Sequence, residues 1–126
     1  MPTVKGLLIG HGKFPETLLD VVRTIIGEIT DFATVSYEVG PSEELEQKIK
    51  QTLANLGDGE KIIFVDLYGS SGANICNRLL ANIPSVAIIC GVNLPMLIKF
   101  FRYRHQLDLK ELVLLVKKTG QEEIRR

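Results

Sequence analysis

Four short apolar segments separated by helical patterns constrain the fold of this chain more than any other feature. The segments are residues 4–9, 33–39, 61–66 and 85–90. The first, third and fourth are almost continuously hydrophobic, as expected for strands of a parallel sheet that is covered on both faces. The second alternates apolar with polar residues, which is typical of a half-exposed strand near a sheet edge. Because strands and helices alternate, the sequence predicts an α/β fold with right-handed crossovers.

Five helical patterns occupy the intervals between these strands and the end of the chain. They begin at Pro15, at Ser42, near Ala73, at Leu94 and at Leu109. Ser42 is expected to cap the second helix and Asn93 the fourth, because short polar side chains accept hydrogen bonds from the first free backbone N–H groups. The last helix is expected to run to Lys118 and to end at Gly120.

The length of the chain fits one doubly wound domain over residues 1–126. A domain of this size buries about two-thirds of the surface that its unfolded chain exposes, so it can form a core without disulfides or metals. We expect a mainly parallel sheet of four strands in the order 2-1-3-4, with helices on both faces and room for an added edge strand. The chain carries 15 Lys and Arg against 15 Asp and Glu. This balance argues against nucleic acid as a partner, since nucleic-acid binders usually carry a basic excess.

The two cysteines, Cys76 and Cys90, lie in apolar surroundings and are too few for a disulfide framework. We interpret both as small hydrophobic side chains. The sequence has no apolar run that approaches the ~20 residues needed to span a bilayer. Its N-terminus also lacks a basic region followed by a cleavable apolar stretch. These features predict a protein of the reducing cytoplasm.

Small and polar residues gather where the predicted strands end. In an open parallel sheet, ligands bind beyond the carboxyl ends of the strands, where the strand order reverses. His11 stands between two glycines after the first strand, and Asp66 ends the third. If these strands are neighbours, the two residues end about 4.8 Å apart. The Asp66 carboxylate could then accept a hydrogen bond from one imidazole nitrogen and leave the other nitrogen free as a nucleophile.

Each of these residues also has a structural interpretation. His11 could cap a turn, and Asp66 could form a salt bridge or cap a loop, since an unpaired carboxylate beside a buried strand would be costly. The segment Gly69-Ser70-Ser71-Gly72 lies just before a predicted helix, where backbone N–H groups and two hydroxyls can surround a phosphoryl group. The same four residues are equally compatible with an ordinary turn.

Single residues exclude several familiar motifs. Leu7 stands where a Walker A loop needs its first glycine, and Pro15 occupies the third glycine position of a dinucleotide-binding fingerprint. A receiver-type aspartate site would need acids directly after the first strand, and none occurs there before Glu16. The only other histidine, His105, lies in a basic helix end, so the sequence predicts no metal site.

Three segments resemble the mannose-type enzyme IIA family of the bacterial phosphoenolpyruvate:sugar phosphotransferase system (PTS). Residues 8–12, Leu-Ile-Gly-His-Gly, are similar to the family's active-site histidine segment. Residues 64–74 resemble its second segment and residues 91–97 its third, so the resemblance covers essentially the whole chain. The second segment departs from the family in two places. Tyr68 replaces a typical tryptophan, and Gly69-Ser70-Ser71-Gly72 replaces a Gly-Gly-Ser-Pro-like run.

The resemblance implies a phosphocarrier, enzyme IIA (EIIA), which is a phosphotransferase that accepts a phosphoryl group on His11 from phosphohistidine of the small carrier HPr. The group would pass on to a histidine of enzyme IIB (EIIB), for sugar uptake through membrane permease components. Asp66 would orient the imidazole, and Ser71 with the neighbouring backbone would hold the phosphate. The departure around Ser70 leaves the choice between the two serines open. The resemblance also implies a homodimer that needs no metal or other cofactor.

An apolar docking rim around the strand ends is a further hypothesis, with Phe14, Leu94, Met96 and Leu97 as candidates. Met96 and Leu97 fit equally well as core residues. Two other functions are compatible with the sequence. One is a regulatory module of the same ancestry that senses phosphorylation, and the other is a small-molecule-binding domain in which His11 contacts a ligand. The sequence does not identify the sugar, because specificity lies with the membrane components.

Overall fold

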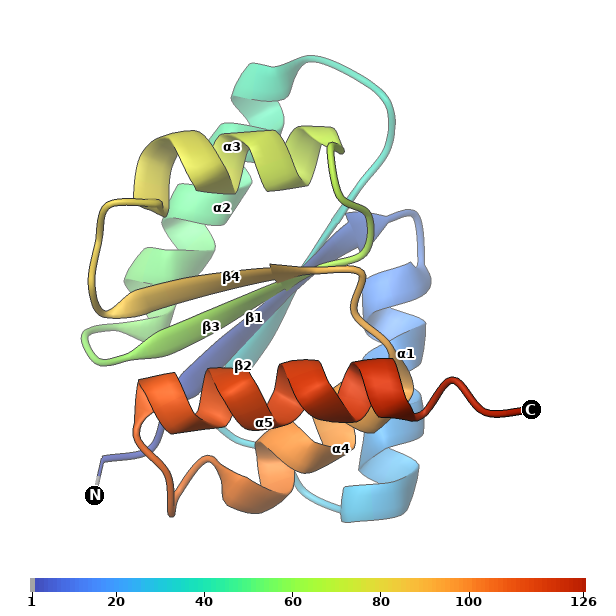
Figure 1. Cartoon of the computed structure of the whole chain (residues 1–126). Coiled ribbons are helices and arrows are strands. Elements are labelled where there is room, and N and C mark those ends of the chain that lie inside the picture. The colour runs from blue at the N-terminus through green and yellow to red at the C-terminus, as the bar shows by residue number, and fades with distance from the viewer. Residues whose placement is uncertain (1) are drawn as a thin grey trace.

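The computed structural model describes residues 2–126, which form a parallel sheet with helices on both faces (Figure 1). In chain order the elements are β1 (Lys5–His11), α1 (Phe14–Ile26), β2 (Phe32–Tyr37), α2 (Ser42–Leu56), β3 (Lys61–Val65), α3 (Ser71–Leu80), β4 (Val86–Cys90), α4 (Leu94–Tyr103) and α5 (Leu109–Glu122). All strand pairs are parallel, in the order β2-β1-β3-β4. The predicted α/β class and strand order are confirmed, and no added edge strand occurs within the described residues.

Two hydrophobic cores flank the sheet, because the central strands β1 and β3 direct alternate side chains to opposite faces. Leu8 and Phe64 point into the core beneath α1, α4 and α5. Leu7 and Ile63 point into the core beneath α2 and α3. All four side chains are fully buried. The continuous hydrophobicity of these two strands therefore reflects burial on both faces.

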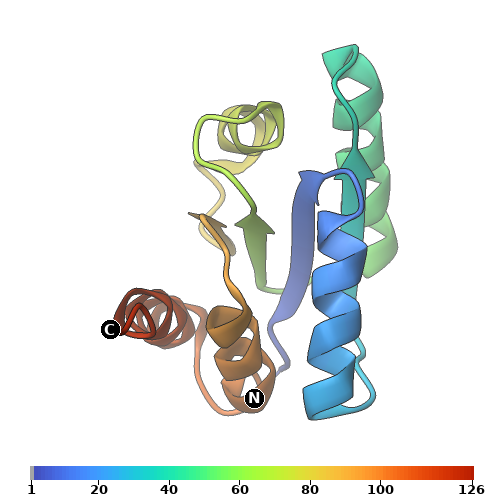
Figure 2. The same cartoon turned by 90° about the vertical axis from the view of Figure 1, so that its right-hand side faces the viewer.

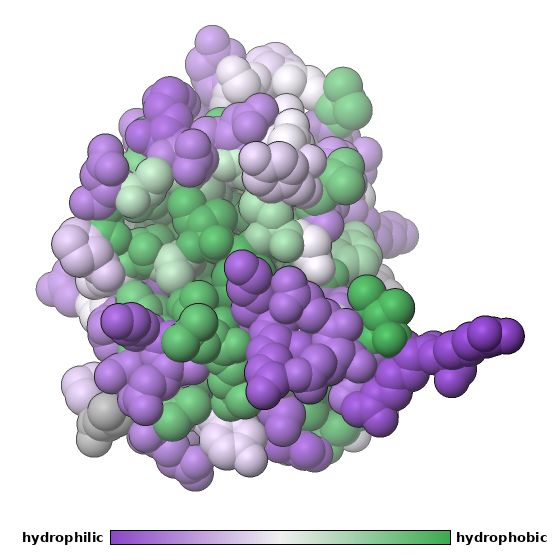
Figure 3. Space-filling model, viewed as in Figure 1, coloured by the Kyte–Doolittle hydropathy of each residue, from purple (hydrophilic) through white to green (hydrophobic). Residues whose placement is uncertain are grey.

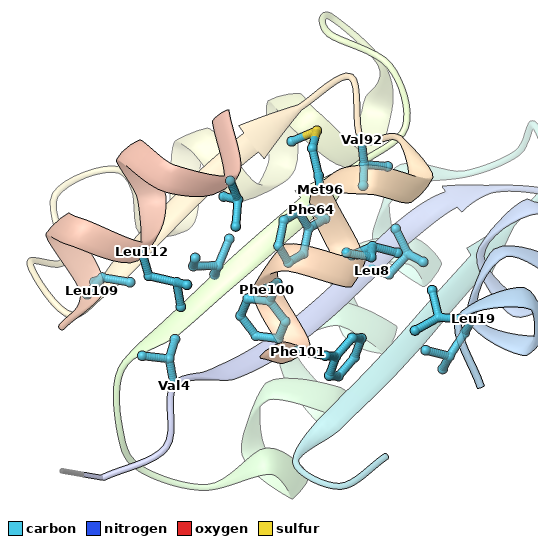
Figure 4. Packing of buried hydrophobic residues seen from close by; sticks show 14 residues of the cluster. Val4, Leu8, Leu19, Phe64, Val92, Met96, Phe100, Phe101, Leu109 and Leu112 are labelled. Atoms are coloured by element: carbon cyan, nitrogen blue, oxygen red, sulfur yellow. The ribbon is translucent and has the colours of Figure 1, made fainter. Parts of the chain in front are cut away.

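The core beneath α4 and α5 is built around phenylalanine rings (Figure 4). The ring of Phe100 lies edge-on to Phe64 at 5.2 Å and to Phe101 at 5.1 Å. Such edge-to-face pairs contribute about 0.5–1.5 kcal/mol each beyond the burial of their surface. Leu112 of α5 is fully buried in the same core. This packing holds α4, and with it the turn that follows β4, against the sheet.

The starts of α2 and α3 differ from the sequence predictions. Ser42 is the first helical residue of α2 instead of its cap, because the extended residue before it is Pro41 and no side chain caps this helix. The third helix begins at Ser71, two residues earlier than predicted. Its cap is Ser70, whose hydroxyl accepts the Ala73 N–H at 3.2 Å.

The predicted end of the last helix is wrong, because α5 continues through Gly120 to Glu122. Gly120 serves close packing instead of termination. A Cβ atom at this position would lie 2.5 Å from Cγ of Met96, so only glycine lets the two helices approach this closely. Asn93 caps α4 as predicted by accepting the Met96 N–H at 3.2 Å. Its side-chain amide also donates to the Gly120 carbonyl at 3.1 Å, which ties the cap to α5.

The strand β4 is less covered than its sequence predicts. Each of its residues, Val86–Cys90, is only half-buried, whereas we expected a strand covered on both faces. The reason is its place at the edge of the sheet, opposite the predicted edge strand β2. Figures 1 and 2 both show β4 between α3 and α5. In Figure 3 the same region shows hydrophobic surface between more hydrophilic parts of the molecule.

Among the described helices, none has the length and apolarity to cross a bilayer.

Candidate functional site

His11 and Asp66 follow from two adjacent strands at the switch point of the sheet. His11 is the last residue of β1, and Asp66 comes directly after β3, which pairs with β1. The helix after β1, α1, packs on one face of the sheet, whereas the helix after β3, α3, packs on the other. In parallel sheets this divergence opens a crevice at the carboxyl ends of the strands. The structure therefore brings the two predicted residues together at the expected edge.

The carboxylate of Asp66 holds His11 through two contacts. Its Oδ2 atom lies 2.7 Å from Nδ1 of the imidazole and accepts the His11 backbone N–H at 2.9 Å. An ionised carboxylate only accepts hydrogen bonds, so in the neutral imidazole Nδ1 carries the ring proton and Nε2 carries the lone pair. The His11 side chain is 44% exposed and that of Asp66 only 14%. The imidazole is thus open to solvent, while the carboxylate that holds it stays largely buried.

The position of Asp66 is fixed by the backbone around it. The Asp66 N–H donates to the Ile9 carbonyl at 3.1 Å, which continues the pairing of β3 with β1. A Cβ atom at Gly10 would lie 3.1 Å from both Cγ of Asp66 and the Phe14 ring, so the glycine makes room for the carboxylate. Oδ1 of Asp66 is buried without a hydrogen-bond partner among the described residues. Such unsatisfied buried groups are rare in folded proteins.

Tyr37 forms the other wall of the site. It is the residue paired with His11 across β1 and β2, and the two ring centroids lie 4.6 Å apart at a tilt of 42°. Its carbonyl accepts the Gly12 N–H at 2.9 Å, and its hydroxyl accepts the Gly72 N–H at 3.2 Å. Tyr37 was not among the predicted site residues, because the alternation of its strand marks it only as an inward-facing residue. The predicted strand ran on to residue 39, so the position of Tyr37 at the end of β2 gave no signal in the sequence.

Two of the four predicted phosphate-binding residues, Ser70 and Gly72, have structural tasks in α3. Ser70 is buried, and its hydroxyl is bonded to the Ala73 N–H as the helix cap. Gly72 packs against the sheet so closely that a Cβ atom there would lie 2.9 Å from Ile9. Its N–H is already bonded to the Tyr37 hydroxyl. These two residues therefore shape the start of the helix.

Ser71 is the serine that lines the same pocket as the imidazole. It is exposed at the first position of α3, and the pocket, which Tyr37 also lines, has a volume of about 80 Å³. This volume suits a group of a few heavy atoms and is far below the ~300–1,000 Å³ of ordinary small-molecule sites. The first turn of α3 has no acidic residue, so the positive end of the helix dipole is not offset there. Gly69, at φ +80°, makes the turn that leads from β3 into this helix.

The hypothesised apolar rim is corrected by the structure. Met96 and Leu97 are buried core residues, as their alternative interpretation expected. The apolar side chains that are exposed after the strands are those of Phe14, Val39, Leu67 and Tyr68. Three of these four follow strands β2 and β3, so the exposed apolar side chains at this end of the sheet come mainly from the loops after these two strands.

The cysteines and the second histidine lie outside this chemistry. Burial, together with the nearby Cys90, raises the pKa of the Cys76 thiol to about 12, so this thiol stays protonated at neutral pH. Burial and then the Asp66 charge raise the pKa of Cys90 as well. His105 lies at the opposite end of the sheet, where its Nδ1 is 2.7 Å from the Thr3 hydroxyl. Within residues 2–126 no cluster of three or more His, Cys, Asp or Glu side chains could hold a metal ion.

Together these features define a class: an α/β domain whose switch point combines an oriented histidine with a helix N-terminus suited to an anion. Within that class the chain belongs to the EIIA-man family, described as the PTS system fructose IIA component, whose model matches residues 6–117. The family resemblance found in the sequence is thereby confirmed.

Proteins that are similar to this chain in sequence or in structure are named as EIIA or EIIAB components. The fructose-specific EIIA component of Bacillus subtilis is 28% identical over 121 residues, which cover 94% of this chain and 83% of that protein. The mannose-specific EIIAB component of Escherichia coli K12 is 31% identical over 124 residues, and the chain spans only 38% of its length. The crystal structure of an EIIA component from Streptococcus agalactiae has a TM-score of 0.89 at 21% identity, covers 98% of this chain and 96% of its own, and shows the shared fold. The chain is an EIIA component of the mannose family of the PTS.

Proposed function

We propose that the chain is a cytoplasmic phosphocarrier that accepts a phosphoryl group on Nε2 of His11 from phospho-HPr. It then donates this group to a histidine of EIIB, which serves sugar uptake. One observation carries the proposal: the 2.7 Å contact of Asp66 with Nδ1 leaves Nε2 of a half-exposed imidazole with its lone pair free. Membership of the EIIA-man family supports HPr and EIIB as the two partners.

The transfer exchanges one P–N bond for another. The Nε2 lone pair of His11 forms a bond to phosphorus while the P–N bond to the donor imidazole breaks and returns its electron pair to the donor nitrogen. Nδ1 keeps its proton, and the positive charge that develops on the ring is stabilised by the Asp66 carboxylate. Donation to EIIB repeats these events in the reverse sense. Because like bonds are exchanged, the protein supplies mainly positioning and charge stabilisation.

The phosphoryl group on Nε2 would lie beside the N-terminus of α3. We assign the direct contact to the Ser71 hydroxyl, because Ser71 is exposed in the pocket that His11 also lines. Ser70, Gly69 and Gly72 support this contact by capping the helix, turning the chain and allowing close approach. The small pocket argues against the alternative of a small-molecule-binding domain, because a sugar would not fit inside it.

Reconstituted phosphotransfer tests the proposal and separates a carrier from a regulatory module. The chain is incubated with phosphoenolpyruvate, enzyme I and HPr, and is expected to acquire an acid-labile, base-stable phosphoryl label. Addition of the cognate EIIB is then expected to remove this label, because the carrier passes its group on. Label that stays on the chain in the presence of EIIB would favour the regulatory sensor, and a chain that takes no label would contradict the proposal.

We also propose that the carrier is a homodimer that pairs through β4. The outer edge of this strand is unpaired within the described residues, and an apolar groove of about 500 Å³ runs beside it. Exposed apolar strand edges of this kind pair with other chains. The wild type is expected to sediment at twice its mass of 14.0 kDa, and Ile88→Lys in the groove is expected to restore the monomer mass. A wild type that is monomeric at micromolar concentration would contradict the dimer.

A further inference from the structure

We propose that the Tyr37 hydroxyl binds the phosphoryl group carried by His11. The hydroxyl accepts a hydrogen bond from the N-terminus of α3 and would donate its own proton to the phosphoryl group. This inference rests on the proposed phosphorylation of His11 and adds a residue to that site. It starts from the hydrogen bonds at the beginning of α3, where the N–H groups of Gly72 and Ala73, which a phosphate could otherwise use, are already engaged.

Two N–H groups that the start of a helix leaves without an intrahelical partner are bonded inside the protein. The Ala73 N–H donates to the Ser70 hydroxyl at 3.2 Å. The Gly72 N–H donates to the Tyr37 hydroxyl at 3.2 Å. The helix therefore offers a ligand less direct amide capacity than an uncapped N-terminus, which is the usual anion site. The Tyr37 hydroxyl stands at the point where the Gly72 amide would otherwise meet the ligand.

A tyrosine hydroxyl that accepts one hydrogen bond still has a proton to donate. Tyr37 accepts from Gly72, and no acceptor for its own proton is found among residues 2–126. The residue is 8% exposed, and a buried tyrosine hydroxyl usually finds a partner for each of its hydrogen-bonding groups. An N–H donor on the phenol oxygen also polarises the O–H bond and makes it a stronger donor. This free proton is therefore suited to an anionic oxygen.

The architecture places that proton at the phosphoryl site. Tyr37 and His11 are partners in the register of β1 and β2, and their ring centroids lie 4.6 Å apart. Both residues line the same small pocket as Ser71. Gly72 lets the start of α3 lie this close to the sheet, because a Cβ atom at that position would lie 2.9 Å from Ile9. The phenol ring also packs against the imidazole.

Tyr37→Phe tests the inference, since it removes the hydroxyl and keeps the ring that packs on His11. We expect the first-order rate of phosphoryl transfer from phospho-HPr to fall about tenfold, the usual effect of losing one hydrogen bond to a charged group. The KM for phospho-HPr should stay unchanged, because the hydrogen bond forms only to the transferring group. The matched control is Tyr103→Phe in α4, remote from the site, which should transfer at the wild-type rate. Wild-type transfer by Tyr37→Phe would overturn the inference.

A measurement on the wild type keeps the inference testable if Tyr37→Phe does not fold. The Tyr37 hydroxyl proton, observed by NMR at low temperature, is expected to move downfield when His11 is phosphorylated. An unchanged resonance would overturn the inference. A wild-type chain that acquires no label would overturn the proposed function and this inference with it. Label on the wild type combined with unaffected transfer by Tyr37→Phe would overturn the Tyr37 role alone.

Discussion

His11→Ala is expected to abolish labelling of the chain by phospho-HPr and to leave the fold intact. The substitution removes Nε2, the atom that forms the new P–N bond, and no other side chain in the pocket offers a comparable nitrogen. The imidazole is 44% exposed, so its loss opens no closed cavity and should cost little stability. The measurement is the amount of acid-labile phosphoryl label after reaction with phosphoenolpyruvate, enzyme I and HPr, with circular dichroism as the check on folding.

His105→Ala provides the matched control for this prediction. It makes the same chemical change at an exposed histidine on the far side of the sheet, where the ring contacts only the Thr3 hydroxyl among the described polar groups. This variant should take up label at the wild-type rate. Acid-labile label that persists in His11→Ala, or disappears in His105→Ala, would show that the phosphoryl group is carried elsewhere.

Asp66→Asn is expected to slow phosphoryl transfer about 10²-fold, the second largest effect. Oδ2 of Asp66 accepts hydrogen bonds from both Nδ1 and the backbone N–H of His11, and both bonds lose their charge assistance in the amide. Loss of about 2–3 kcal/mol of charge stabilisation on the ring corresponds to roughly two powers of ten in rate. An Asn side chain can also turn its NH₂ group toward Nδ1, which would shift the ring proton to Nε2 and block attack.

The effect of Asp66→Asn is measured in a single-turnover transfer from phospho-HPr, with the imidazole tautomer followed by ¹⁵N NMR. Asp20→Asn is the matched control, since Asp20 forms an exposed ion pair with Arg23 on α1. We expect Asp20→Asn to behave as the wild type in both measurements. Transfer by Asp66→Asn at the wild-type rate would show that the carboxylate is not needed to orient His11.

The sheet could be predicted from sequence because burial on both faces leaves a clear pattern in its central strands. The segments of β1 and β3 have the pattern of buried strands, and the expected strand order 2-1-3-4 placed them next to one another. His11 and Asp66 were expected to meet on the condition that this order holds. β4 has an equally apolar sequence but lies at the edge, since apolarity alone does not distinguish a central strand from a half-buried edge strand.

The remaining differences arise from contacts between residues far apart in the chain. Gly120 resembles a helix terminator, but its role depends on Met96 in another helix. The roles of the two serines depend on where α3 begins, which a local pattern locates only to within a few residues. Tyr37 contacts Gly72, 35 positions away, through a hydroxyl whose partner no periodicity predicts. The sequence therefore predicted only those site residues whose positions are set by the strands of the sheet.

Identifying the nitrogen atom to which the phosphoryl group is attached tests this account most directly. The chain is labelled with [¹⁵N]histidine, phosphorylated through HPr, and examined by ¹⁵N and ³¹P NMR. The geometry at His11 predicts coupling of phosphorus to Nε2, with a proton retained on Nδ1 beside Asp66. Coupling of phosphorus to Nδ1 of His11, or to either nitrogen of His105, would contradict it.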